Sequence, residues 1–156
     1  MNIILSTLMT VVVGGILGGA VDSNYSGRLS QFVTSPDSPA IKLYSPAGAS
    51  SGGWRGEHAG KWLYAASMSY ARTGDKEILA RIESVADYLI SVQGENGYLG
   101  CYKPEKRFYV QPAPDTYNVA WDVWNNAYIL KGMCKLYIVS GEKNNLAAAT
   151  KIVDLM

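Results

Sequence analysis

The sequence is poor in the residues that bind metals and carry redox chemistry. It holds one histidine and two cysteines, which excludes a self-contained zinc site built from cysteine and histidine. The cysteines, Cys101 and Cys134, stand far apart in the sequence, each without a second ligand at metal-binding spacing. A single disulfide between them would not amount to the set of several disulfides that holds a small secreted domain together. We favour two reduced, partly buried thiols.

Charge is also scarce and balanced. Charged residues make up 17% of the chain and the formal net charge is +1. The sequence therefore has neither the basic footprint of a nucleic-acid-binding protein nor a polybasic membrane patch. It contains no Ser/His/Asp arrangement, phosphate-binding loop or HExxH motif. Tyrosine is abundant instead, with 11 residues against 2 phenylalanines. Tyrosine suits clefts and interfaces, although helix packing accounts for most of these rings.

The first twenty residues are uncharged and allow two interpretations. An apolar run from Ile3 to Leu17, followed by small residues at 18–20, has the outline of a secretory signal peptide. The lack of Lys or Arg and the interrupting glycines suit a buried Gly/Val-rich lead segment equally well. The run is too short and broken for a membrane span. We expect a periplasmic or secreted protein, with a cytoplasmic location as the alternative.

Helical periodicity dominates residues 21–156. We expect a short helix at 25–33 and a loop at 34–56, where serine, proline and glycine cluster. A second loop covers 103–117, which holds three prolines, with a short extended piece at 108–110. The other segments have apolar residues spaced for helix faces and predict four helices in two hairpins: 57–73, 76–92, 122–140 and 143–156.

The two hairpins look like copies of one another. Aligning Tyr70 with Tyr137 superposes further identical pairs at the same offset: Gly74 and Gly141, Lys76 and Lys143, Leu79 and Leu146, Ala80 and Ala147, Asp87 and Asp154. A recurring helix–Gly–acid–helix unit is typical of stacked hairpins in a solenoid or a closed ring. Such folds need about three or more units. Since Met156 falls inside a helix, we expect either that more of the ring follows or that a partner covers the open face.

Polar and aromatic side chains gather where the first and third of these helices begin. Glu57 and His58, after Trp54, could offer a carboxylate and an imidazole to a ligand. The simpler interpretation is that Glu57 stabilises the helix dipole and His58 packs against neighbours. Trp124 aligns with Glu57 in the repeat and lies close to Asp122 at the matching helix start. Stacking rings with nearby carboxylates are what sugar recognition requires, although inter-helix packing of the tryptophans is the plainer alternative.

Two further observations bear on chemistry. Tyr102 follows a glycine-punctuated turn at 97–100 and could reach the same cleft. Carboxylates for a two-acid glycosidase are present at Glu57, Asp115 and Asp122, but only the fold can fix their separation.

Taken together, these segments resemble the start of glycoside hydrolase family 127, the β-L-arabinofuranosidase-like hydrolases. The similarity runs over about residues 14–156. Its most specific parts are Trp54-Arg55-Gly56-Glu57-His58-Ala59-Gly60-Lys61-Trp62, Gly97-Tyr98-Leu99-Gly100 and Trp121-Asp122-Val123-Trp124. The resemblance implies an all-α fold: an incomplete (α/α)6 toroid made of helical hairpins, after an irregular N-terminal segment.

The family's chemistry, as the resemblance implies it, is retaining hydrolysis by a cysteine thiolate held on zinc, with a glutamate as general acid/base. The motifs that carry this chemistry are expected beyond Met156. Neither Cys101 nor Cys134 has the paired-cysteine context of the family, so no catalytic or metal-binding role is assigned to them. Zinc is expected only in the full-length protein. The residues expected to bind substrate are Glu57, His58, Trp54, Tyr102, Asp122 and Trp124. Relatives often have His-Lys where this chain has Asn126-Ala127, which puts the sugar contacts on that side in question.

The sequence thus predicts the N-terminal part of a glycoside hydrolase, inactive alone, that forms one side of a cleft for an arabinose-containing or related plant glycan. No nucleic-acid or membrane partner is expected, and the open end of the toroid predicts self-association. A non-catalytic carbohydrate-binding or assembly unit is the alternative. A sugar isomerase or epimerase on the same toroid is weaker, because the single histidine, His58, does not supply the several that it would need.

Overall fold

The described part of the chain is built from helices. The computed structural model describes residues 36–45, 54–108 and 121–156, and these ranges contain no strand. In chain order the elements are α2 (Pro39–Lys42), the 3-10 helix η1 (Trp54–Gly56), α3 (Glu57–Thr73), α4 (Lys76–Ser91), the 3-10 helix η2 (Pro104–Lys106), α5 (Asp122–Ser140) and α6 (Lys143–Leu155). All four predicted long helices are present, each within one residue of its expected bounds.

The ends of α3 and α5 show that the hairpin is repeated in three dimensions. Gly74 and Gly141 close these helices in the left-handed region, with φ of 66° and 78°, which glycine adopts without steric penalty. Each glycine N–H donates to a tyrosine carbonyl in the preceding helical turn at 2.8 Å. The hydroxyls of Thr73 and Ser140 also match, because each accepts the N–H of the acidic residue after the glycine at 3.2 Å. The sequence repeat is therefore a structural repeat.

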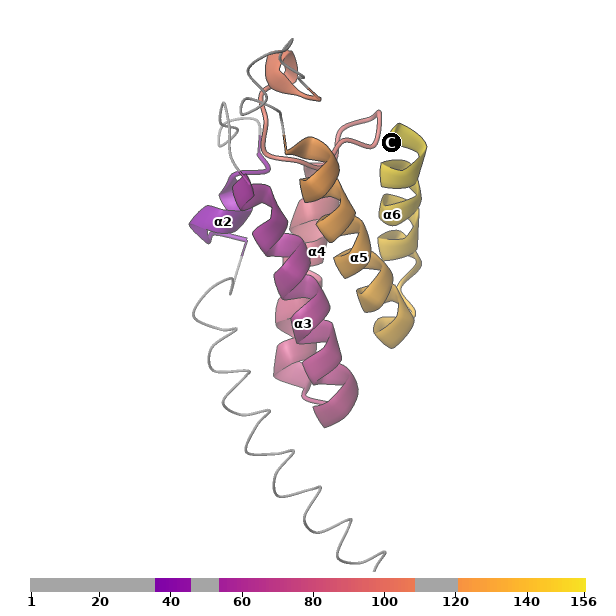
Figure 1. The fold of residues 1–156 in the computed structure, drawn as a ribbon. Helices are drawn as coiled ribbons and strands as arrows, with labels where there is room; N and C mark the ends of the chain where they lie inside the picture. The colour runs from indigo at the N-terminus through magenta and orange to yellow at the C-terminus, as the bar shows by residue number, and fades with distance from the viewer. Residues whose placement is uncertain (1–35, 46–53, 109–120) are drawn as a thin grey trace, which may run out of the picture.

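Two parallel helices form the centre of the arrangement. Figure 1 shows α3 and α5 side by side and running in the same direction, while α4 and α6 return toward the end where α3 and α5 begin. The apolar faces of the helices meet in one core that includes Leu63, Ile82, Leu89, Ile129 and Met133, all fully buried. This succession of helical hairpins is the architecture of part of an α/α toroid.

Glycines allow α3 and α5 to approach closely. A methyl group on Gly60 would lie 2.2 Å from the carbonyl carbon and oxygen of Tyr128, and one on Gly132 would lie 2.7 Å from the carbonyl oxygen of Gly60. Only hydrogen atoms fit between the two backbones at this crossing. Gly60 and Gly132 thus fix the distance between the helices that carry the candidate site.

The hairpins are also joined at the end of α4. The Gln93 side chain donates to the carbonyl of Gly97 and to that of Ala148 in α6, at 3.0 Å each. Gly97 has a φ of 90° and sits so close to α6 that a Cβ would lie 2.1 Å from the Lys151 carbonyl oxygen. One amide and one glycine therefore connect the first hairpin to the last helix.

The structure departs from the sequence predictions in two places. Within the expected loop 34–56, Pro39 occupies the first turn of the short helix α2. The reason is burial, because Ile41 is fully buried and Tyr44 packs inside and donates its hydroxyl to the Gly56 carbonyl. The extended piece expected from residue 108 is wrong at Phe108, which lies in a turn with a φ of 51°.

Other expectations have mixed outcomes. The predictions for 1–20 and 25–33 lie outside the described residues. Cys101 and Cys134 are both free thiols, the first buried and the second half-buried, as expected. None of the helices within the described ranges combines the length and apolar character of a membrane span.

Candidate functional site

The candidate site lies at the end where α3 and α5 both begin. Glu57 is the first residue of α3 and is 7% exposed. Lys61, one helical turn later, donates to its Oε1 at 2.5 Å, and the indole N–H of Trp124 in α5 donates to Oε2. Two positions that are equivalent in the repeat are therefore in direct contact. Both N-termini add partial positive charge where the carboxylate lies.

The surroundings of Glu57 and His58 keep both in definite protonation states at neutral pH. Burial by itself would raise the pKa of Glu57, but the hydrogen bonds from Lys61 and Trp124 and the positive charge of Lys61 together lower it. Burial also lowers the pKa of half-buried His58, against the opposing pull of the Glu57 charge. The site thus presents an ionised carboxylate beside a neutral imidazole.

Exposed aromatic rings stand beside this carboxylate. Trp121 and Trp124 are 42% and 45% exposed, and their rings meet edge to face at 6.2 Å. Trp124 also contacts Tyr128 at 5.1 Å, and the Lys61 ammonium lies 4.6 Å from the centre of the Tyr128 ring. Large rings left half in water at a polar site offer the flat apolar surface on which a sugar face stacks.

Asp122 anchors the segment before α5. Its carboxylate is fully buried and accepts from the Tyr98 hydroxyl at 2.5 Å and from the Phe108 N–H at 2.7 Å. Burial and the bond to this carboxylate raise the pKa of Tyr98 far above its usual value. Tyr98 in turn accepts the Tyr102 N–H at 3.2 Å, while the Tyr102 hydroxyl accepts the Trp121 N–H at 3.1 Å. This network holds the turn after α4 against the start of α5.

Comparison with known proteins places the chain in a family. A family model for the catalytic domain of the β-L-arabinofuranosidases of glycoside hydrolase family 127 (GH127) matches residues 21–156. The chain belongs to this family. A solved structure described as a GH127 β-arabinofuranosidase superposes with a TM-score of 0.59 over 84% of this chain at 18% sequence identity, a likeness that shows the fold. The chain spans 24% of that protein. No curated protein sequence matches it.

Four of the six predicted substrate-binding residues of this GH127 chain fall into the two clusters just described. Glu57 and Trp124 are joined by a hydrogen bond. Asp122 and Tyr102 belong to the hydrogen-bond network around Tyr98. His58 follows Glu57 and is half-buried. The side chain of Trp54 and the whole of Asp115 lie outside the described residues. That these residues contact a sugar stays a prediction.

Sequence reasoning missed two members of these clusters. Lys61 forms the ion pair with Glu57, and its position one helical turn later is the spacing at which such pairs form. Tyr98 joins Asp122 to the turn before it, a contact between residues 24 positions apart. No local pattern in the sequence reveals that contact.

The described residues of this GH127 chain do not fit the zinc ion that the family implies. Cys101 is buried beside the amide of Asn125, whose Nδ2 lies 3.6 Å from the sulfur. Burial and the Asp122 charge raise the pKa of the Cys101 thiol, against a hydrogen bond with Gly56, so the reactive thiolate is disfavoured. Within the described ranges no three His, Cys, Asp or Glu residues gather as a metal site would require.

Proposed function

We propose that this chain forms one wall of the sugar-binding cleft of a GH127 glycoside hydrolase acting on arabinose-containing or related glycans. The observation that carries the proposal is the pairing of ionised Glu57 with half-exposed Trp124 at the shared start of α3 and α5. Each carboxylate oxygen accepts one bond from the protein and has a further lone pair for a hydroxyl group. The neighbouring rings would receive the apolar face of the sugar.

In this proposal the chemical step belongs to another part of the toroid. In support, the chain spans 24% of the solved relative, and the described residues lack both a metal-binding group and an activated thiol. Glu57 has a lowered pKa, whereas a general acid needs a raised one. Glu57 therefore binds and orients the sugar, and the thiolate and zinc ligands come from elsewhere in the enzyme.

Calorimetric titration of the chain with methyl β-L-arabinofuranoside tests the binding role. We expect weak, saturable binding that falls about tenfold in Glu57→Gln, as removal of a charged hydrogen-bonding partner predicts. Trp124→Phe should weaken binding as well, because it removes the indole N–H and ring area. Glu77→Gln, the same change on an exposed α4 position, should leave binding unchanged. Equal effects of Glu57→Gln and Glu77→Gln would refute the site.

The same preparation tests where the chemistry lies. We expect no release of the aryl group from an aryl β-L-arabinofuranoside by the chain alone. Hydrolysis that survives repurification and disappears in Cys101→Ala would place the nucleophile in this chain and contradict the proposal.

A non-catalytic binding or assembly unit is the second candidate, favoured by exposed apolar side chains. Ile138 and Val153 are 71% and 55% exposed on α5 and α6, so these helices keep apolar surface that another element could cover. Sedimentation equilibrium separates the candidates. A stable dimer that dissociates in an Ile138→Lys variant would favour the assembly unit, whereas a monomer with sugar affinity would favour the cleft wall.

A further inference from the structure

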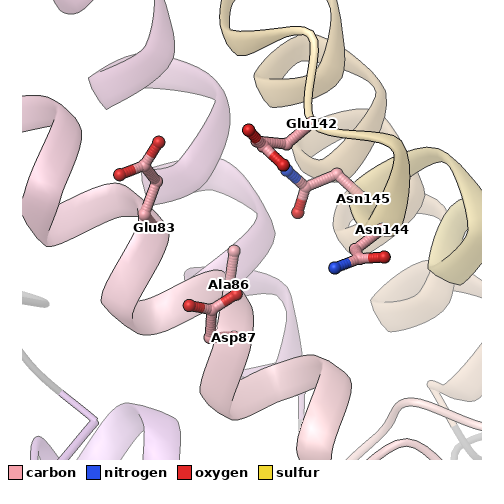
Figure 2. A pocket seen from close by; sticks show the side chains of 6 residues that line it. All are labelled: Glu83, Ala86, Asp87, Glu142, Asn144 and Asn145. Carbon is pink, nitrogen blue, oxygen red and sulfur yellow. The ribbon is translucent and has the colours of Figure 1, made fainter.

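Asn125 in α5 is a buried amide that hydrogen bonding does not explain. The carboxylates that line the hollow between α4 and the start of α6 are within reach of water (Figure 2). The side chain of Asn125, by contrast, is fully buried, and its Oδ1 has no hydrogen-bond partner. Its Nδ2 donates to the sulfur of Cys101 at 3.6 Å, and a thiol is a weak acceptor. A buried polar atom without a partner lowers the stability of a fold, so the amide needs another explanation.

The packing of this amide against Gly56 explains it by shape. A Cβ on Gly56 would lie 2.6 Å from Nδ2 of Asn125, 2.7 Å from its Cγ and 3.0 Å from the sulfur of Cys101. The bare α-carbon of Gly56 therefore packs where no side chain would fit. The Gly56 carbonyl accepts the hydroxyl of buried Tyr44, which holds the glycine in place. An amide is flat, whereas a leucine of similar volume carries two methyl groups on a tetrahedral carbon and is thicker.

Gly56 and Asn125 each adjoin one member of the Glu57–Trp124 pair. Gly56 comes immediately before Glu57, and Asn125 comes immediately after Trp124. The starts of α3 and α5 are thus joined by two neighbouring contacts, the packing of the glycine on the amide and the hydrogen bond from the indole to the carboxylate. A hydrogen bond tolerates only a narrow range of donor–acceptor distances. A thicker group at position 125 would therefore separate the carboxylate from the indole.

We propose that Asn125 is a positioning residue of the sugar site, whose flat amide sets the distance between Gly56 and α5 at which the Glu57 carboxylate meets the Trp124 indole. The inference rests on the proposed function, in which this pair binds the sugar. Asn125 is fully buried and acts through the pair without touching the sugar. The unpartnered Oδ1 is then a loss of stability that accompanies the geometry of the site.

Asn125→Leu tests the proposal, with the nuclear magnetic resonance signal of the Trp124 indole N–H as the readout. Trp124→Phe assigns this signal by removing it, and donation to a carboxylate shifts it downfield. We expect Asn125→Leu to keep the helical circular dichroism, to move the indole signal upfield and to weaken binding of methyl β-L-arabinofuranoside about fivefold. The urea midpoint should change little, because loss of the unpartnered amide offsets the strain of the thicker side chain.

Three further variants separate positioning from general damage to the core. Ser67→Ala is the matched control, because Ser67 in α3 is also fully buried with an unpartnered hydroxyl oxygen. It should change neither the indole signal nor the affinity. Asn125→Asp keeps the flat shape and should retain both at pH 5, where burial keeps the introduced carboxyl protonated. Gly56→Ala thickens the same contact from the other side, so it should move the indole signal upfield even where Asn125→Leu does not fold.

The indole signal reports the position of the Glu57 carboxylate whether or not a sugar binds. If the unchanged chain had no affinity for the arabinoside, the proposed function would fail while this test of Asn125 remained valid. An indole signal that stays in place in both Asn125→Leu and Gly56→Ala would overturn the positioning role. An equal shift in Ser67→Ala would overturn it as well.

Discussion

Replacing Gly60 by alanine measures how closely α3 and α5 are packed. The added methyl would lie 2.2 Å from the carbonyl carbon and oxygen of Tyr128 and 2.5 Å from the Ile129 nitrogen. Unbonded carbons are comfortable at about 3.5 Å, so the helices must separate by roughly 1.3 Å. The obstacles are backbone atoms, which no rotamer change can move away.

The expected change in the free energy of unfolding for Gly60→Ala follows from two opposing effects. Alanine favours a helix interior over glycine by about 1 kcal/mol, whereas overpacking a core costs about 1–3 kcal/mol and occasionally more. Because the clash is with backbone, we take the upper end and expect a net loss of about 2 kcal/mol. For a chain of this length that loss lowers the Tm by roughly 4–8 °C.

Urea denaturation followed by circular dichroism at the helical band provides the assay. Gly132→Ala, whose nearest atom would be 2.7 Å away, should be less costly than Gly60→Ala. Gly74→Ala is the control without a clash, because no atom lies within 4 Å there. It should cost about 1–2 kcal/mol through its left-handed backbone alone. A Gly60→Ala variant at least as stable as the unchanged chain, as helix propensity alone predicts, would refute the close crossing.

Three further predictions concern Asp122, His58 and the two cysteines. Asp122→Asn should cost about 1.5–3 kcal/mol, since two bonds to a charged acceptor are weakened; unaltered stability and unaltered amide exchange at Phe108 would show that the network is dispensable. Because folding lowers the pKa of His58, the unfolded chain binds more protons, so stability should decline as the pH falls below about 6.5. In a plot of the free energy of unfolding against pH, His58→Gln should reduce the slope below about pH 6.5. An unchanged slope would contradict the lowered pKa of His58. With a thiol reagent, Cys134 should react in the native state and Cys101 only upon unfolding, and equal rates would contradict the buried thiol.

The long helices could be predicted because their signals are local. Gly74 and Gly141 end helices by a conformation that other residues adopt at a cost, and Asp75 caps α4 by accepting two backbone N–H groups. The hairpin repeat then placed Glu57 and Trp124 at equivalent helix starts. Their direct hydrogen bond was beyond the pattern, because equivalence in a repeat does not fix the distance between units.

The contacts that complete the site are non-local and escape sequence reasoning for that reason. Tyr98 reaches Asp122 only because α4 returns the chain to the start of α5. Burial of Ile41 stabilises a short helix among turn-forming residues whose composition predicts a loop. The fold was thus predictable at the level of hairpins, while the partners of each polar group depended on packing.

The course of the chain separates two kinds of positions. Each hairpin carries the chain away from the end that holds Glu57 and Trp124 and back again, so the glycine turns that close α3 and α5 lie at the far end of the helices (Figure 1). Both turns are exposed and open, with no atom within 4 Å of an added Cβ. Exposed turns of this kind tolerate insertions best. A peptide tag or a fluorescent label could be placed there while the Glu57–Trp124 pair remains as it is.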